Sequence, residues 1–409
     1  MAETPGLDLP ASVTRNAPST GAATGAAAFV ARLLNTKERS PESRPERPEC
    51  VRRDLGRMAE YLDGLPLSPP VVRQPFELGL AAMRACRWDE AVAYFKQAMS
   101  VTSGVHLVAL LNQIGVCRYT QGRVEDALRC FHQSARLADE LHTKRGRVQA
   151  LNNIGLIHRD RGELDGALEY LEESLTLARE LDDQWAVAIL LGNTGNVWHD
   201  RGELEKALEY HIEALKISRE IKDQWGVVSE LADIGSIYMD KGRPDLALKY
   251  DEQALANARS VGYPLGVVTC LANIADIHRR RGRPDDALKC EEEALAVARK
   301  AGYGLGVASE LGNIGLDLLA RGKHEEAVPK LAEALSILLS IRVADGPRQA
   351  LTGLDRCADR LGRQRVEALL KQSGFDDDSA SDLLSRVDQT RMKRPAKTAD
   401  RQLLPPVAG

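Results

Sequence analysis

The chain has 409 residues and a nearly balanced charge, with 55 Lys and Arg against 59 Asp and Glu and a formal net charge of −4. This balance argues against a general nucleic-acid binder, which would be strongly basic. No run of about eighteen apolar residues occurs, so no segment is expected to span a membrane. Met1 is followed by acidic, proline-bearing sequence rather than by a signal peptide, and a cytoplasmic location is expected.

The seven cysteines are scattered along the chain, and none forms a CxxC pair. Their number is odd, which does not suit a complete disulfide framework. We therefore expect free thiols, buried or partly buried, in a reducing compartment rather than disulfides or a zinc site.

Residues 1–70 differ in composition from the rest of the chain. Ten of the 18 prolines fall in residues 1–75, and the remainder is rich in Ala, Thr, Ser and mixed charge. Such a segment is expected to be mostly disordered, with short helical pieces at 26–34 and 50–62. Two interpretations stay open: a loosely docked N-terminal helix, or a regulatory segment lying in the protein's own groove.

Residues 71–343 carry an internal repeat with a period of forty residues. Glycine recurs at one position and alanine five residues later, at Gly122, Gly162, Gly202, Gly242, Gly282 and Gly322 and at Ala127, Ala167, Ala207, Ala247, Ala287 and Ala327. A fixed period of this kind indicates a stack of similar supersecondary units.

Each unit is predicted to contain two helices joined by a tight turn. The spacing of apolar residues predicts a first helix over about 184–201, a glycine turn at Gly202 and a second helix over about 203–221. The second helix is expected to direct a set of apolar side chains inward: Leu204, Ala207, Leu208, Ile212, Leu215 and Ile217. Glycine in the middle of the first helix, as at Gly195, costs about 1 kcal/mol relative to alanine, so we expect it to allow close helix packing.

The ends of the array are expected to be atypical because an end unit has only one neighbour. The first unit begins near Gln74 and is four residues shorter, and the seventh, over about 305–341, carries Pro329 inside its second helix, where it should cause a kink. We expect capping helices over 344–375 and a flexible tail over 376–409, acidic at first and then basic.

The pattern resembles the tetratricopeptide repeat over about residues 76–343. Leu191, Thr194, Gly195 and Trp198 match the first-helix positions of that family, and Ala207 and Ala214 match its two alanines; its second-helix aromatic position holds His211, Asp251 or Glu291. The forty-residue period is similar to that of Pins-type scaffolds, kinesin light chains and bacterial Rap-type regulators. The resemblance implies an all-α, right-handed superhelix of about seven repeats.

One position of the first helix, directly before Ile154 and its equivalents, is polar in six units: Gln113, Asn153, Asn193, Asp233, Asn273 and Asn313. In a repeat stack the first helices line the concave face. A side-chain amide can bond the N–H and the C=O of a peptide together, as the asparagine rows of the similar proteins imply. The alternative is that these amides bond a neighbouring helix and hold the register. Asn196 is a further candidate for the groove.

A second polar row lies at the end of the first helices: Asp160, Asp200, Asp240 and then Arg280. The helix dipole disfavours an acid at this end by up to about 1 kcal/mol, so something must offset the cost. The acids either pair with basic residues of the same or a neighbouring unit, or recognise a basic partner. Arg279, Arg280 and Arg281 are expected to give the groove a positive end.

No constellation of residues supports catalysis, a cofactor or a metal. The triplet His158-Arg159-Asp160 matches a kinase catalytic loop, but the required Asn is replaced by Asp165 and no glycine-rich phosphate loop is present. We therefore expect a non-catalytic scaffold or adaptor that binds a protein or peptide in extended form, without specific nucleic-acid binding. The alternatives are a Rap-type regulator whose groove senses a peptide and controls an output partner, and an accessory subunit or chaperone of a larger enzyme. The oligomeric state is left open.

Overall fold

The computed structural model of the protein describes residues 70–84, 87–340 and 347–392. All regular structure in these ranges is α-helical, with no strand. No helix of the described ranges has the length and the apolar character needed to cross a membrane. The helical pieces predicted in residues 1–70, and the placement of that segment in the groove, lie outside the described residues.

Seven consecutive helix pairs form the repeat array. The first four pairs are α3 (Pro70–Arg84) with α4 (Trp88–Met99), α5 (Val105–Thr120) with α6 (Val124–Glu140), α7 (Lys144–Asp160) with α8 (Leu164–Glu180), and α9 (Gln184–Asp200) with α10 (Leu204–Glu220). The next three are α11 (Gln224–Asp240) with α12 (Pro244–Ser260), α13 (Pro264–Arg280) with α14 (Pro284–Ala301), and α15 (Gly304–Ala320) with α16 (His324–Ser340). The all-α solenoid and the helix bounds predicted for the unit at 184–221 are confirmed.

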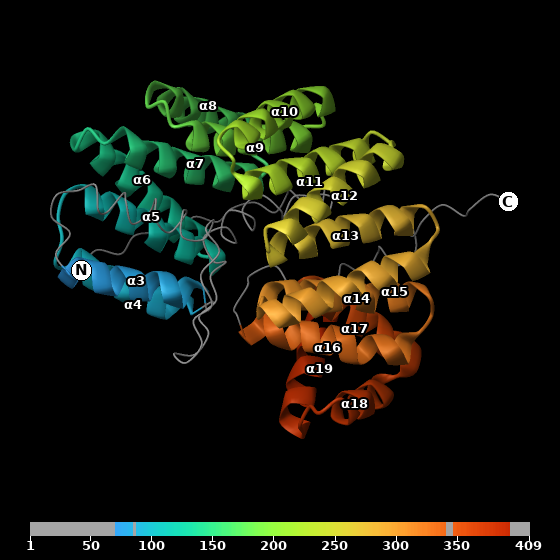
Figure 1. Ribbon diagram of the computed structural model, residues 1–409. Coiled ribbons are helices and arrows are strands. Elements are labelled where there is room, and N and C mark those ends of the chain that lie inside the picture. Colours follow the sequence, from blue (N-terminus) through green and yellow to red (C-terminus); the bar gives the residue numbers. More distant parts are fainter. Residues whose placement is uncertain (1–69, 85–86, 341–346, 393–409) are drawn as a thin grey trace.

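The helix pairs follow one another along an arc (Figure 1), from α3 and α4 through α7–α10 to the C-terminal helices. Each second helix packs against its own first helix and against the first helix of the next pair. The first helices also pack on one another, α5 on α7, α9 on α11 and α11 on α13, more closely than successive second helices do. Because neighbours approach most closely on the inside of a curve, the first helices line the inner face of the arc.

The turn between the two helices of a unit depends on backbone conformation rather than on lack of space. Gly202 has φ of 82°, in the left-handed region that side chains disfavour. A Cβ atom added there would meet nothing within 4 Å. The glycine turn predicted from the period is therefore confirmed for a conformational reason.

The packing between the two helices of a unit requires small residues. Ala207 and Ala214 are fully buried in α10. A Cβ added at Gly195 of α9 would lie 2.8 Å from the imidazole of His211, so only glycine leaves room for that ring. The prediction that mid-helix glycine allows close packing is confirmed here.

The apolar side chains of the stack form three clusters rather than one continuous core. One runs from α3 to α7, the second from α7 to α10, and the third from α10 to the C-terminal helices. The second and third clusters meet at α10 and α11, where the buried His211 and Glu230 lie.

The prediction for Ile212 is wrong. Its side chain is 51% exposed, whereas the preceding residue, His211, is fully buried. Successive residues of a helix point about 100° apart, so the inward position falls on the polar His211 and not on the apolar Ile212.

The C-terminal end is more structured than the sequence suggested. The expected capping helices are α17 (Pro347–Leu361) and α18 (Arg363–Gln372), but a further helix, α19 (Asp377–Met392), occupies the first part of the predicted flexible tail. α19 packs on α17 and α18 and buries Leu383, Leu384 and Val387. Its aspartates at 377 and 378 lie in the first turn, where the helix dipole favours acids. The expectation of a flexible tail is thus wrong for residues 377–392, and residues 393–409 lie outside the described ranges.

Candidate functional site on the inner face

The amide row predicted for the groove lies on the first helices at different depths. Gln113, Asn153 and Asn193 are buried, as is Asn196, and the later members of the row are partly exposed, namely Asp233, Asn273 and Asn313. The side chains of the row are therefore more exposed to the inner face in the C-terminal half of the array.

Several amides of the row bond neighbouring side chains. Asn193 Nδ2 donates to Asn152 Oδ1 at 2.7 Å, which links α9 to α7. Asn273 Nδ2 donates to Asp251 Oδ1 at 2.9 Å, which links α13 to α12. These bonds join adjacent units, as the structural interpretation of the row expects, although they go to side chains rather than to helix backbone. The partner-binding role of the row stays a proposal.

At the N-terminal end the row contains buried polar atoms with free bonding capacity. Gln113 Oε1 has no hydrogen-bond partner within the described part of the chain, and neither amide atom of the adjacent Asn112 has one. Buried polar atoms are usually paired, so these unpaired amide atoms are an exception within the stack.

The acids at the ends of the first helices pair with the preceding unit. Arg159 Nε donates to Asp200 Oδ2 at 2.5 Å, and the Arg159 side chain is only 2% exposed. His199 Nε2 lies 2.8 Å from Asp240 Oδ2. Each pair joins the last turns of two successive first helices. A basic neighbour thus offsets the unfavourable helix-dipole position of Asp200 and Asp240, and Asp160 lies exposed at the equivalent position.

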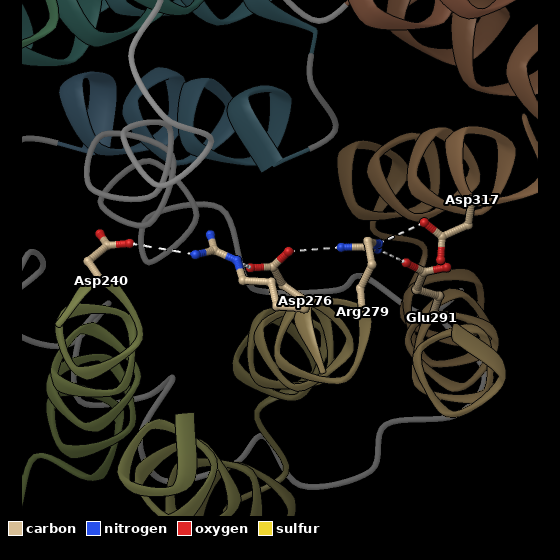
Figure 2. A network of polar contacts seen from close by, with 6 residues as sticks. Asp240, Asp276, Arg279, Glu291 and Asp317 are labelled. Atoms are coloured by element: carbon tan, nitrogen blue, oxygen red, sulfur yellow. Dashed lines mark hydrogen bonds and ion pairs between the residues drawn. The ribbon is translucent and has the colours of Figure 1, made fainter. Parts of the chain in front are cut away.

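A chain of ion pairs continues this row toward α15 (Figure 2). Arg280 bridges Asp240 and Asp276, at 4.0 and 2.8 Å. Arg279 contacts Asp276 at 3.0 Å and Asp317 at 2.7 Å, and it also pairs with Glu291. The two arginines therefore do not form the predicted positive end, because four carboxyl groups surround them.

Several carboxyl groups near this chain are buried between helices. Burial raises the pKa of Asp251 to about 8, against the hydrogen bond from Asn273 and together with the negative charge of Asp233. Burial raises the pKa of Glu310 to about 8, and the adjacent Glu291 adds to this effect. Burial and the charge of Asp317 also raise the pKa of Glu291 to about 7, while Arg279 draws it down.

The sequence analysis missed Glu230, Asp276, Glu310 and Asp317, and it noted Asp251 only as a departure from a family position. A signal for Glu230 was present: the equivalent residues of three earlier units are apolar, Leu110, Ala150 and Leu190. An acid at a position that is apolar in sibling units indicates a buried polar contact.

His158 and Arg159 of the kinase-like triplet contact neighbouring side chains within the stack. The His158 ring stacks on Tyr170 with centroids 5.1 Å apart, and its Nδ1 lies 2.5 Å from Glu163 Oε2. Arg159 holds Asp200, as described above. These contacts account for His158 and Arg159 as packing and pairing residues.

The cysteines of the described ranges are free thiols. Burial raises the pKa of Cys117 and of Cys357 to about 12 and raises that of Cys270 as well. Since the thiolate is the reactive form, these three thiols are unreactive at neutral pH.

Comparison with known proteins agrees with this architecture. The model of the tetratricopeptide repeat matches residues 106–180, 146–220 and 228–300. The comparison with curated proteins found no match.

Among solved structures, a Rap protein complexed with competence and sporulation factor is 12% identical, with a TM-score of 0.55, 92% of this chain covered and 99% of that chain. The apo form of the quorum sensor NprR from B. thuringiensis is 15% identical, with a TM-score of 0.51 and coverages of 90% and 98%. Apo RapI is 14% identical, with a TM-score of 0.50 and coverages of 70% and 99%.

Identities this low show a shared fold alone. The family match, the forty-residue period and the seven helix pairs agree with one another. The chain therefore contains tetratricopeptide repeats within residues 106–300.

Proposed function

We propose that the protein is a non-catalytic scaffold whose inner face binds an extended segment of a partner protein. The observation that carries the proposal is the repetition of polar side chains at the same two positions of successive first helices, on the inside of the arc. An extended chain presents its N–H and C=O groups at regular intervals, so a row of amides and acids can bond them in successive units.

The charges of this face favour a basic segment as the partner. The exposed or partly exposed side chains at the ends of α7, α9, α11 and α13 include Asp160, Asp200, Asp240 and Asp276, against Arg279 and Arg280. Acids therefore outnumber bases where a partner would lie. Because exposed charge pairs are screened over about 10 Å at 0.1 M salt, binding should weaken as the salt concentration rises.

The fold of the neighbours supports binding of another molecule without identifying it. The Rap structure was determined with competence and sporulation factor, and its fold extends over most of this chain. A Rap-type regulator, in which a peptide changes the affinity for an output partner, is the second candidate. In a scaffold, a groove-bound peptide would leave the binding of any other partner unchanged.

The first test identifies the partner by crosslinking mass spectrometry on the full chain in its own cells, followed by calorimetry with the crosslinked segment as a synthetic peptide. Asn153→Ala should weaken peptide binding a few-fold to about tenfold, since a hydrogen bond is worth about 0.5–1.5 kcal/mol. Its melting temperature should stay close to that of the wild type.

Asn193→Ala provides the matched control, because its amide holds Asn152 in the preceding unit. This variant should lower the melting temperature as well as the affinity. If Asn153→Ala instead lowers the melting temperature and leaves the affinity intact, the row is a structural ladder and the proposal is wrong.

A further inference from the structure

A compact polar cluster lies between the fourth and fifth helix pairs. His211 of α10 is fully buried, and its Nδ1 lies 2.8 Å from Oε2 of Glu230 on α11. Asp233 lies one turn further along α11, and one ligand atom from each of the three side chains falls within 4.8 Å of the other two. Within the described ranges, no other set of three His, Cys, Asp or Glu side chains converges in this way.

The cluster is particular to this place in the stack. The position of His211 holds the apolar Phe131, Leu171 and Leu331 in three units and the acids Asp251 and Glu291 in two, and His211 is its single histidine. The neighbouring first helix is adapted to the polar side chains as well. A Cβ added at Gly195 would lie 2.8 Å from the His211 ring, and one added at Gly192 would lie 2.7 Å from Glu230 Oε1.

The charges of the cluster do not balance. A protonated His211 supplies one positive charge against the carboxylates of Glu230 and Asp233. Arg159 is the cation facing the cluster from α7, and it is already paired with Asp200. Asp251 of α12 also lies near Asp233 and supplies no positive charge. One negative charge is thus left over, on the partly exposed Asp233, beside the buried pair of His211 and Glu230.

A divalent cation would remove this imbalance, because a neutral imidazole and two carboxylates together carry two negative charges. One nitrogen and two carboxylate oxygens form a donor set that Zn²⁺ and Mn²⁺ accept. His211 Nδ1 and Glu230 Oε2 already face one another, and the ion would take the place of their hydrogen bond. Asp233 is partly exposed, so it gives the ion and its remaining water ligands a route from the inner face.

We propose that His211, Glu230 and Asp233 bind a divalent transition-metal ion that joins the fourth and fifth helix pairs. The ion would couple α10 to α11 at the place where two of the apolar clusters meet. It would therefore hold the relative orientation of the N-terminal and C-terminal parts of the inner face. This site shares Asp233 with the amide row, but it uses none of the amide side chains of that row and requires no partner protein.

The test uses the full chain treated with a chelator and then dialysed. Titration calorimetry with ZnCl₂ and with MnCl₂ should show one ion bound per chain. Co²⁺ should give visible d–d absorption bands when it binds. Each ion that binds should also raise the melting temperature, because it binds only the folded arrangement.

Two variants test the ligands, and circular dichroism checks that each one folds. His211→Leu introduces the residue that the equivalent positions 171 and 331 carry. Asp233→Asn changes the partly exposed ligand with little change of shape. Each should weaken metal binding by roughly tenfold or more. Glu291→Gln is the matched control, because Glu291 is the equivalent of His211 two units later, and it should bind metal as the wild type does.

Absence of metal binding by the wild-type chain overturns the proposal. So does equal affinity of the wild type, His211→Leu and Asp233→Asn, since the ion would then sit elsewhere. Loss of binding in the two ligand variants with retention in Glu291→Gln supports it.

Discussion

Asp251, Glu291 and Glu310 place carboxyl groups between packed helices, where a charge loses its hydration. The protein meets this cost in two ways. Asp251 and Glu310 keep the proton, since burial raises the pKa of each to about 8. Glu291 is paired with Arg279. Protonated carboxyls can donate as well as accept a hydrogen bond, so Asp251 and Glu310 act as neutral hydrogen-bonding groups at neutral pH.

The stability of the protein should therefore fall as the pH rises toward 8. An unfolded Asp loses its proton near pH 3.9, whereas the folded Asp251 retains it to about pH 8. The contribution of Asp251 to the free energy of unfolding is complete below about pH 4. It is lost as the pH rises through 8, at up to about 1.4 kcal/mol per pH unit. Asp251→Asn, which stays neutral, should show a smaller decline in unfolding free energy between pH 5 and pH 8 by urea denaturation. The partly exposed Asp276→Asn serves as the control, and an Asp251→Asn decline as steep as that of the wild type would contradict the assignment.

Ala207 tests how closely the helices of one unit approach. Its side chain is fully buried in α10, so Ala207→Leu should destabilise the protein by about 1–3 kcal/mol through overpacking. Ile212→Leu, on the exposed side of the same helix, should change stability by less than about 0.5 kcal/mol. Urea denaturation followed by circular dichroism measures both, and equal effects would mean that the close contact does not exist.

At the scale of the helix and its connections, the turns between units place either a glycine or a residue with a side chain in the left-handed backbone region. Gly262 and Gly302 have φ of 63° and 62° at the turn that leads out of the second helix. The equivalent residue of an earlier unit is His142, with φ of 52°. A side chain in this conformation is strained by about 1–2 kcal/mol, whereas glycine is not.

His142→Gly should consequently stabilise the protein. The relief of strain is offset in part by the greater freedom of glycine in the unfolded chain, so the expected gain is about 0.5–1 kcal/mol. Gly202→Ala, at φ of 82°, is the reverse change and should cost about 1 kcal/mol. Thermal unfolding of both variants decides the point: a destabilised His142→Gly would show that the His142 side chain makes a contact worth more than the strain.

The features of the fold that were predictable from the sequence are local ones. The turn at Gly202 depends on its own backbone, and Ala207 depends on packing within one unit. α19 was missed because few apolar residues lie among its charges, so its helical period is weak. The contact of His211 with Glu230 could not be predicted, because the two lie in different units and meet only through the way the units stack. The candidate amide row was predictable as a row, but the bond from Asn193 to Asn152 again depends on stacking.

At the scale of the whole molecule, successive units are joined by a regular series of ion pairs. A basic residue before five of the six turn glycines pairs with an acid 36 residues earlier: Arg161 with Glu125, Arg201 with Asp165, Lys241 with Glu205, Arg281 with Asp245 and Arg321 with Asp285. Exposed pairs of this kind each contribute about 0–1 kcal/mol. Their regularity helps to hold one unit in register with the next.

The three apolar clusters predict that the stack opens in segments. A repeat protein is stabilised by contacts between neighbouring units, so parts with separate cores can open independently. Native-state hydrogen exchange in increasing urea should show different opening free energies for α3–α6 and α12–α16, with a change near α10 and α11. A single opening free energy for all helices would show that the clusters unfold together.

The constant offset of these ion pairs bears on how such a chain can change its length. Recombination that removes or duplicates one whole forty-residue unit leaves every remaining basic residue facing an acid at the same offset, so the array can be shortened or extended without mispairing. Units that share a buried polar contact, such as His211 with Glu230 or Asn273 with Asp251, are the exception, because other units lack these side chains. The outer pairing thus permits exchange of units, while the polar interior assigns the middle units to fixed places in the order.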